Sequence, residues 1–501
     1  MEWPPKIAGL NGTEHYKFFG VVICLLFLFF VINAPPKSAL HGIPLINGDS
    51  GFPFLLFKRK LRFLQCSQQL FDEGFSKSTS GFRIMSHRGE VTVLPSACAN
   101  DLRNDERLSA REAIREEFLA HMAIFGPITG GPLTDEAVSK SMIRITRALG
   151  PWTSPMSEEI ELCLQEHWTD SEDWHEVRLA DGLLRMVVRV SARAFLGERL
   201  SRDPRWIEAT LGYMAEGLTS VFTLHLFPKC LHRVLQWVLP MCRQTRAHLK
   251  QAHTLMKPEI ERRNKMKKKP DDTMTWMEEA SAGSSYDPVA AQLSLSFAAT
   301  HTTSDFLTKL LVHLAQNEGI VSELREEITR EVPGPEIDKQ CIARLRLLDS
   351  VMKESQRMSP LSLATMTRRV RKSFKLSNGL ELPPGSNVAV STASMRDAQF
   401  YADPDTFDGH RFLNLGLSGK EHRHHFVTTS ESHLGFGHGS HACPGRFFAA
   451  HELKIFLCHI LTKYEFRLPD KHEPQSLIAG FFASSNPDTR MLIRRRKEVA
   501  I

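Results

Sequence analysis

The residues with the clearest chemical potential are Phe436 to Gly445, FGHGSHACPG, which place one cysteine in a glycine-rich loop. The apolar-periodic run that follows predicts a helix from about Pro444 to Lys463, because proline suits the first helical position. Cys443 would then lie at the N-terminus of this helix, where the helix dipole and nearby N–H groups stabilise a thiolate. A thiolate in such a loop can ligate heme iron as a strong donor.

The glycines and the phenylalanine of this loop fit the same chemistry. Gly437 and Gly439 lack side chains and permit unusual backbone angles, so the loop can lie close against a flat macrocycle. Phe436 would cover the proximal side of the sulfur. The pattern therefore predicts a loop that both shields and tunes the sulfur of Cys443.

Two other interpretations of Cys443 stay open on the residues alone. A buried cysteine is usually an inert thiol, and we read the other eight cysteines in that way. Zinc binding is the second alternative, because histidine and cysteine are zinc ligands. The histidines near Cys443 match no standard zinc-finger spacing. They are His422, His424, His425, His433, His438 and His441.

The cysteine loop resembles the heme-binding motif of the cytochrome P450 family, Phe-x-x-Gly-x-x-x-Cys-x-Gly, at every fixed position. The matching residues are Phe436, Gly439, Cys443 and Gly445. The resemblance implies heme b bound through the sulfur of Cys443. It also implies that His441 faces a heme propionate, while Ser440 stands where related sequences often carry arginine.

A second motif of that family lies upstream of the loop. Glu354 and Arg357 are three residues apart and share one face of a predicted helix. In the family a second arginine completes the group, and the segment 404–412 makes Arg411 the candidate. A carboxylate held by two guanidinium groups is geometrically rigid, so we expect a structural triad that locks the core near the heme loop.

A long predicted helix, residues 290–317, carries the run FAATHTTS at 297–304. In the family this helix crosses the distal face of the heme, and Thr302 takes the place of the threonine that handles oxygen. A threonine hydroxyl can bond to a carbonyl of the preceding turn, or open a distortion that admits water. The resemblance therefore assigns Thr302 to a proton route.

This distal motif departs from the family's usual pattern at two positions. Ala299 replaces a glycine, and His301 replaces an acidic residue. A histidine here could relay protons near neutral pH or only fill space. Fungal members that modify terpenoids and other secondary metabolites often carry a similar Ala-x-His-Thr-Thr run, so the resemblance is to that branch. We assign His301, Thr302 and Thr303 to the catalytic side.

A basic residue is also expected opposite the other heme propionate. In the family it comes from a helix that corresponds here to about residues 138–149. The usual Trp-x-x-x-Arg is absent from this segment. Arg144 is our candidate, with Arg147 as the alternative.

Composition places the chain among large globular proteins. Of its 501 residues, 42% are hydrophobic and 24% are charged, so a sizeable core can be buried. The net charge of +6 is scattered along the chain, which argues against a nucleic-acid partner. Nine dispersed cysteines without a CxxC indicate a reducing compartment for the main body.

An uncharged apolar run, residues 18–32, predicts a transmembrane anchor over 18–34 that ends before Pro35 and Pro36. No convincing cleavage site follows, so we favour an uncleaved anchor over a signal peptide. The flanking charges do not fix its orientation, and the sequon at Asn11 matters only if the N-terminus is lumenal. Together with the resemblance, this predicts a single-pass protein of the endoplasmic reticulum with its catalytic domain in the cytosol.

The expected fold class is mainly α with a small β portion (α+β), a cytochrome P450-like fold preceded by a transmembrane helix. We divide the chain into a short N-terminal segment (1–17), the anchor (18–34), a linker (35–62) and a heme-thiolate catalytic domain (63–501). Short β runs are expected at 81–94, 374–391 and 464–495, a loop over 261–288, and helices over most of 100–260 and 290–358.

The resemblance implies a heme-thiolate monooxygenase. It would use O2 and electrons from an NADPH-cytochrome P450 reductase to hydroxylate or otherwise oxidise an apolar small molecule, such as a terpenoid or related secondary metabolite. The hydrophobic segment 205–240 could form a mobile lid that dips into the membrane. The alternatives are a heme-thiolate isomerase or dehydratase that needs no O2, and a non-catalytic heme-binding protein.

Overall fold

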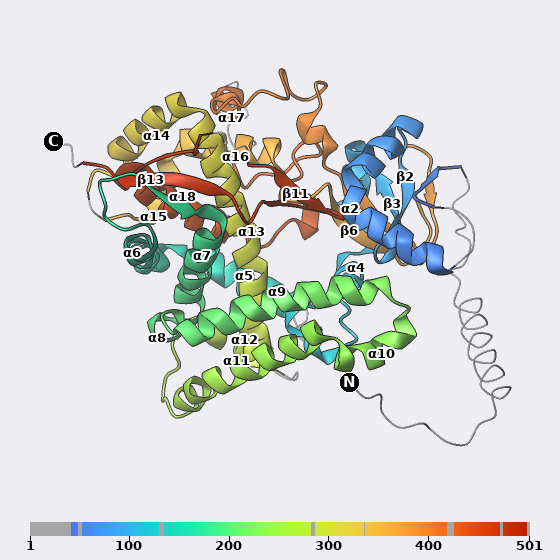
Figure 1. The fold of residues 1–501 in the computed structure, drawn as a ribbon, viewed down its shortest axis with the longest axis horizontal. Coiled ribbons are helices and arrows are strands. Elements are labelled where there is room, and N and C mark those ends of the chain that lie inside the picture. Colours follow the sequence, from blue (N-terminus) through green and yellow to red (C-terminus); the bar gives the residue numbers. More distant parts are fainter. Residues whose placement is uncertain are drawn as a thin grey trace, which may run out of the picture.

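The computed structural model describes residues 42–48, 53–129, 135–281, 286–334, 336–417, 425–470 and 474–497. Over these ranges the chain is mainly helical, with its strands toward the two ends, in agreement with the predicted class (Figure 1). The longer helices are α2 (Pro53–Lys77), α4 (Ala110–Glu117), α5 (Asp135–Arg147), α6 (Leu149–Trp168), α7 (Leu179–Leu196), α9 (Pro204–Leu226), α10 (Lys229–Val238), α11 (Pro240–Asn264), α12 (Thr273–Ala280), α13 (Pro288–Gln316), α14 (Glu318–Glu331), α16 (Arg346–Met358) and α18 (Arg446–Lys463). Short helices are α3 (Ala99–Leu102), α8 (Glu198–Ser201), α15 (Lys339–Arg344) and α17 (Arg411–Leu415).

The strands form one larger sheet and three small ones. The larger sheet has the order β1-β2-β3-β9-β6-β4, with β1 parallel to β2, β3 parallel to β9, and the other neighbours antiparallel. Its members are β1 (Leu45–Ile46), β2 (Phe82–Ser86), β3 (Gly89–Leu94), β4 (Leu108–Ser109), β6 (Ala364–Val370) and β9 (Asn387–Ser391). The small sheets are β10-β13-β5 (Tyr464–Arg467, Arg490–Arg495, His175–Arg178), β11-β12 (Ser476–Ala479, Phe482–Ser485) and β7-β8 (Phe374–Lys375, Glu381–Leu382).

Helix α13 runs through the middle of the molecule, with α7 and α18 on one side and the larger sheet beyond its other side (Figure 1). It begins two residues before the predicted start because Asp287 caps it, accepting from the backbone N–H of Val289 at 2.9 Å, with Pro288 at its first position. Its second half is almost entirely buried in the main apolar core. This burial fixes α13 as the element against which the site is built.

Helix α2 begins at Pro53, inside the range 35–62 that the sequence indicates as a linker. In the same range, β1 pairs with β2. The expected boundary at 62/63 therefore falls within a helix whose apolar residues, such as Phe63 and Leu70, are buried against the sheet. The predicted anchor, 18–34, lies outside the described residues. Among the helices that the structure does describe, none is long and apolar enough to cross a membrane.

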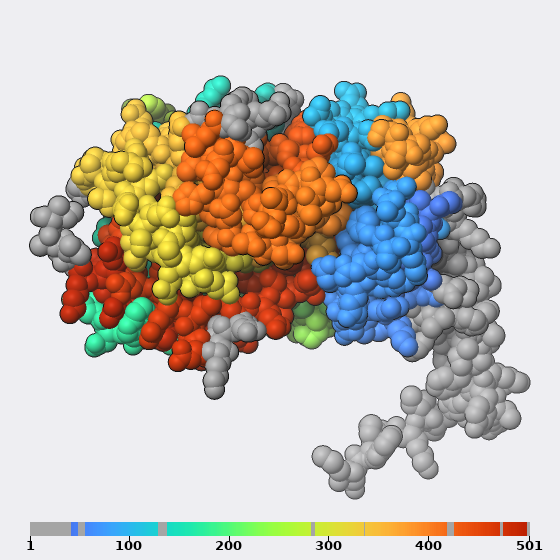
Figure 2. Space-filling view, turned by 90° about the horizontal axis from the view of Figure 1, so that it is seen from above, coloured from blue at the N-terminus to red at the C-terminus, as the bar shows by residue number. Residues whose placement is uncertain are grey.

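The expected loop over 261–288 is wrong in part, because it contains helix α12. Asp272 caps this helix by accepting from the Thr275 N–H at 3.2 Å, and Trp276 is buried on its inner face. Polar residues lie on both sides of α12, so the short amphipathic pattern of this helix could not be recognised in the sequence. In the space-filling view, the segment around α17 (orange) packs between the yellow helices and the blue N-terminal sheet, so these distant parts of the chain form one continuous face (Figure 2).

Candidate active site

Cys443 lies in a tight loop that folds back on itself. Its backbone N–H donates to the Phe436 carbonyl oxygen at 2.8 Å, and the Gly437 N–H donates to the Leu434 carbonyl oxygen at 2.8 Å. Gly437 and Gly439 have φ angles of +69° and +84°, a conformation that glycine adopts without steric cost. The loop therefore has the backbone geometry expected from its glycines.

A second segment, far away in the sequence, forms one wall of this loop. A Cβ atom on Gly439 would lie 2.5 Å from the Arg103 carbonyl oxygen, so no other residue fits there without movement. The next residue, Ser440, donates from its N–H to Asn104 Oδ1 at 2.9 Å and from its hydroxyl to the Arg103 carbonyl oxygen at 3.1 Å. His441 ends the short 3₁₀ turn Gly439–His441 and is exposed.

Helix α18 begins at Arg446, not at Pro444 as predicted, although it ends at Lys463 as expected. Gly445 is its N-cap, and the Ala449 N–H donates to the Gly445 carbonyl oxygen at 2.9 Å. Cys443 therefore lies just outside the helix instead of at its first turn. The electrostatic argument survives, because the N–H groups of Gly445 and Arg446 still point toward the sulfur.

The surroundings of the Cys443 sulfur, without a bound metal ion, favour the protonated thiol over the thiolate. Burial raises the pKa of the Cys443 thiol, and the N–H groups of Gly445 and Arg446 together with the Arg446 guanidinium lower it by less. A metal ion bound to the sulfur would remove the thiol proton outright. The loop thus shields the sulfur from water and leaves its charge to be set by a bound metal.

Glu354, Arg357 and Arg411 meet as expected. Arg357 on α16 donates from Nε and Nη2 to the two Glu354 carboxylate oxygens, each at 2.8 Å, and both side chains are fully buried. Arg411 Nε lies 3.1 Å from each of the same oxygens. Arg357 also donates from Nη1 to the Pro404 and Met395 carbonyl oxygens, at 2.6 and 2.9 Å. The group ties α16 to the segment before α17.

Thr302 and Thr303 lie on different sides of α13. The Thr302 side chain is exposed, and its hydroxyl donates to the Ala298 carbonyl oxygen at 3.0 Å. This is the bond to the preceding turn that the sequence indicated as one of two options. Thr303 is buried in the helix packing. Of the two hydroxyls, only that of Thr302 can meet a molecule beside the helix.

His301 is mostly buried, and burial lowers the pKa of its imidazole, while the Asp305 carboxylate one turn later raises it by less. Within the described chain its Nε2 has no hydrogen-bond partner. Asp305 itself is 2.9 Å from Lys309 Nζ and accepts from the Ser485 N–H of β12. His301 therefore sits on the side of α13 that faces β12, beside an anchored carboxylate.

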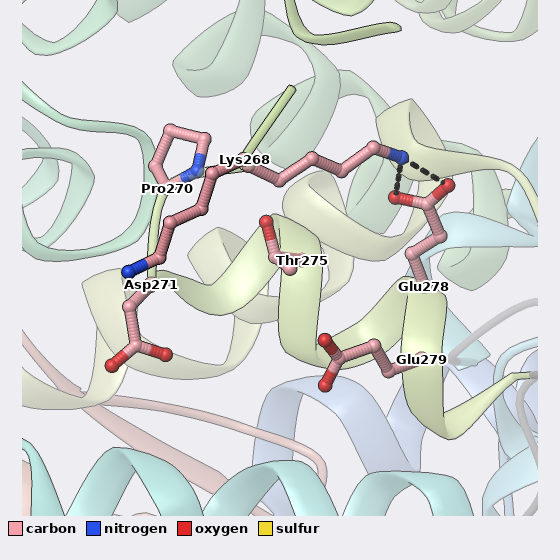
Figure 3. A pocket seen from close by; sticks show the side chains of 7 residues that line it. Lys268, Pro270, Asp271, Thr275, Glu278 and Glu279 are labelled. Carbon is pink, nitrogen blue, oxygen red and sulfur yellow. Dashed lines mark hydrogen bonds and ion pairs between the residues drawn. The ribbon is translucent and has the colours of Figure 1, made fainter. Parts of the chain in front are cut away.

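Arg144 lies in an exposed ion pair on α5. Its Nη1 is 2.5 Å from Glu279 Oε2, and its guanidinium lies over the Trp276 ring at 5.6 Å. Glu279 in turn lines an open, charged hollow alongside α12, where Lys269 of the preceding segment pairs with Glu278 (Figure 3). These contacts give Arg144 structural partners of its own, so it is a weak candidate for holding a propionate.

Arg368 on β6 is the basic residue that the sequence analysis missed. It is buried, and Nε and Nη2 have no partner among the described residues, while Nη1 bonds only the neighbouring Thr367 carbonyl oxygen at 2.9 Å. Burial lowers its pKa to about 10. Residues earlier in β6 reach the cysteine loop, since a Cβ on Gly437 would contact the Met366 side chain at 3.9 Å. A buried guanidinium in need of an acceptor thus lies near this loop.

Strand alternation is the signal that could have found Arg368. In β6 the buried positions alternate from Ala364 to Val370, which puts Arg368 inside and Arg369 outside. Arg369 pairs with Glu116 near the surface, at 3.2 Å. A shift in strand register between Thr365 and Arg368, with Met366 at a φ of +52°, bends the strand at this point.

The histidines near the loop have other partners. His433 Nε2 lies 3.0 Å from Gln356 Oε1, and His438 Nδ1 lies 3.0 Å from Thr429 Oγ1. His425 Nδ1 lies 2.9 Å from Asp349 Oδ2. His422 and His424 fall outside the described residues. Within the described ranges no group of three or more histidine, cysteine or acidic side chains could hold a metal ion.

Taken together, the sulfur loop, the exposed threonine on α13 and the buried triad define a heme-thiolate protein. The cytochrome P450 family model matches residues 144–493. The monooxygenase adrA of Penicillium rubens is 37% identical over 98% of both chains, and the monooxygenase ntnM of a Nectria species is 38% identical over 92% of this chain and 90% of its own. The chain belongs to the cytochrome P450 family and is a cytochrome P450 monooxygenase.

The same fold is found in a solved structure, the retinoic acid-bound cyanobacterial CYP120A1. It is 18% identical, has a TM-score of 0.69, and covers 91% of this chain and all of that one. Heme is the cofactor of this family, and the residues here fit it. Cys443 offers the sulfur, and the unpartnered nitrogens of Arg368 offer donors for the carboxylates of the porphyrin.

Proposed function

We propose that this monooxygenase oxidises an apolar small molecule, a terpenoid or related secondary metabolite, with electrons from an NADPH-cytochrome P450 reductase. The observation that carries the proposal is on α13. Ala298 and Thr302, one turn apart in the middle of this central helix, are exposed, and Phe297 beside them is partly exposed. Such exposure requires open space beside the helix, and the Thr302 hydroxyl is displayed there with these apolar residues.

Aromatic rings continue the apolar lining away from α13. Phe118, after α4, packs edge-on against Phe297 at 5.8 Å. Phe222 on α9 packs edge-on against Phe482 on β12 at 6.0 Å. These residues favour an apolar substrate, because a polar molecule would lose its hydrogen bonds to water there without replacement.

The residues of the chain divide the work as follows. Heme bound at Cys443 supplies oxygen activation and transfer of one oxygen atom to the substrate. The apolar walls hold the substrate and exclude water. Thr302, whose hydroxyl can exchange the Ala298 carbonyl for a water or another acceptor, passes protons beside the helix, and His301, whose imidazole burial keeps neutral, relays them between its two ring nitrogens.

We propose that electrons arrive on the side of the cysteine loop. Arg446 donates from Nη1 to the Cys443 carbonyl oxygen at 2.8 Å and lies over the Phe447 ring at 4.6 Å. Phe447 and Ile143 on α5 are exposed, at 39% and 50%. An apolar, basic patch that touches the ligand cysteine suits a transient electron-transfer partner.

We further propose attachment to the endoplasmic reticulum through the segment 18–34, with α10 resting on the cytosolic bilayer surface. Four large apolar side chains of α10 are exposed, which an interfacial helix would bury. They are Leu231, Val234, Trp237 and Val238. Vesicle-bound protein should show quenching of Trp237 fluorescence by brominated lipid, and Trp237→Phe should remove that component. Equal quenching in this variant would argue against the placement.

The proposed reaction is tested by expressing the full chain with a reductase and supplying a terpenoid panel under ¹⁸O₂. The expected product gains one labelled oxygen and depends on NADPH. Thr302→Ala should lower product formed per NADPH consumed, whereas Thr219→Ala, at an exposed threonine of α9 with the same bond to its preceding turn, should not. A mass-neutral product formed without NADPH would instead indicate an isomerase.

A further inference from the structure

Histidines gather where the turn between β2 and β3 meets α2 and the junction of α9 with α10. His87, in this turn, is fully buried; its ring lies 5.3 Å from that of His225 on α9 and 5.8 Å from that of Phe63 on α2. Beyond them, His232 on α10 stacks with His121 at 6.3 Å. The β2–β3 turn, α9 and α10 thus each contribute a histidine ring to this cluster.

The polar groups of this cluster are poorly satisfied. Neither ring nitrogen of His87 has a hydrogen-bond partner among the described residues, and the same holds for His232 Nδ1. His225 is better placed, since its Nε2 lies 2.7 Å from the Glu117 carbonyl oxygen. Because His87 is fully enclosed, no ligand can reach its nitrogens in this arrangement. Apolar packing therefore holds the junction closed, although the buried ring nitrogens without hydrogen bonds destabilise this arrangement.

The cluster is also surrounded by positive charge. Burial lowers the pKa of His87 well below its ordinary value, and His225, Arg88 and Lys60 lower it further. Burial likewise lowers the pKa of His225 to about 3. The charged or titratable groups that face the cluster are Lys60 of α2, Arg88 of the turn, Glu116 and Glu117 of α4, His121 of the following loop, and Lys229 and His232 of α10.

The two carboxylates are already engaged. Glu117 lies 3.0 Å from Arg88, and Glu116 lies 3.3 Å from Lys229. An imidazolium at His87 would therefore have no free anion beside it and could not be solvated in place. Protonation is compatible only with an open junction that admits water.

We propose that His87 and His225 form a proton-operated latch, which holds the α9–α10 junction closed on the β2–β3 turn and α2 and releases it on acidification. The role of the latch rests on the proposed function, because Phe222 contacts both His87, at 5.2 Å, and Phe482 of β12. Opening the latch would loosen the wall of the proposed substrate space. The motion itself can be measured without any substrate.

Hydrogen–deuterium exchange of the full-length holoenzyme between pH 7.0 and 5.5 tests the latch, after correction for intrinsic exchange. We take ordinary histidine pKa values for the open form. The equilibrium constant for opening at the end of α9 should then rise about eightfold if one histidine gains a proton on opening, and about seventyfold if two do. His87→Phe and His225→Gln should each remove about one histidine's share, and the double variant should remove both. The control is His253→Gln, at an exposed histidine of α11 paired with Asp287 at 3.5 Å.

Unchanged corrected exchange across this pH range in the wild type, or the same rise in the double variant, would overturn the latch. Binding of 4-phenylimidazole to the heme gives a second readout: its association rate, calculated for the neutral form of this ligand at each pH, should rise in parallel at low pH in the wild type and stay flat in the double variant. Failure of the proposed oxidation would leave the exchange result intact, so the two ideas fail separately.

Discussion

The backbone nitrogen of Cys443 lies 2.8 Å from the carbonyl oxygen of Phe436, and this hydrogen bond closes the loop that presents the sulfur. The bond joins the first and eighth residues of the loop, so the position of the sulfur depends on every backbone angle between them. Gly437 and Gly439 provide the two left-handed angles that this closure needs.

Gly439→Ala should destabilise the loop by more than backbone strain alone. The new Cβ would meet the Arg103 carbonyl oxygen at 2.5 Å, in addition to the cost of about 1–2 kcal/mol for a left-handed angle. Gly379→Ala is the matched control, because Gly379 has a φ of +86° with no atom near its absent side chain. Heme content and chemical denaturation should separate the two variants. Equal behaviour would mean that the contact with Arg103 is unimportant.

Glu354→Gln should lower the free energy of unfolding by about 3–5 kcal/mol, because it leaves the buried Arg357 and the mostly buried Arg411 without their anion. The comparison is Asp405→Asn, which breaks an exposed pair with Arg396 and should cost less than about 1 kcal/mol. Denaturant titration of the holoenzyme measures both. A loss below about 1 kcal/mol for Glu354→Gln would contradict a structural role for the triad.

Arg368→Leu should weaken heme binding by about tenfold to a hundredfold, the loss expected for one hydrogen bond between charged groups. In the heme-free protein the same change should be neutral or stabilising, because it removes a buried guanidinium with unpartnered nitrogens. Arg369→Leu, at the outward-facing neighbour that pairs with Glu116, is the control and should leave heme transfer to apomyoglobin unchanged. If both variants lose heme at the wild-type rate, Arg368 does not hold the cofactor.

Glu452 on α18 should make stability fall as pH rises. It is fully buried, and burial raises its pKa from 4.5 to about 8, while a hydrogen bond from Ser191 at 2.8 Å opposes the shift. Between these values the unfolded chain has lost the proton and the folded chain keeps it, so stability declines by up to about 1.4 kcal/mol per pH unit. Glu452→Gln cannot ionise, and its stability relative to the wild type should grow from pH 5 to pH 8. Glu278→Gln, at an exposed pair with Lys269, should show no such trend.

Local patterns in the sequence predicted most of the fold and the backbone of the cysteine loop. The strands within 81–94, the start of α13 and the cysteine loop depend on neighbouring residues, and each lies within a residue or two of its expected place. Long-range contacts were not predictable. The approach of Arg103 to Gly439 joins residues from opposite ends of the domain, and no periodicity encodes it.

The buried groups show the same limit. Arg144 and Arg368 are alike as residue types, and only tertiary packing leaves one in a surface ion pair and the other enclosed without partners. The start of α18 was misplaced because proline at position 444 fits a first helical turn equally well as a residue before it. The fold class could be predicted from the hydrophobic and turn patterns of the sequence. The residues that surround the cysteine loop could not, because tertiary packing alone brings them there.

The most direct test of the account is the spectrum of the reduced carbon monoxide complex of the full chain. We predict a Soret band characteristic of thiolate ligation in the wild type, absent in Cys443→Ser and retained in Cys458→Ser, at a buried cysteine of α18 that serves as control. A histidine-type band in the wild type, or a thiolate band and turnover that survive the loss of Cys443, would contradict the central claim.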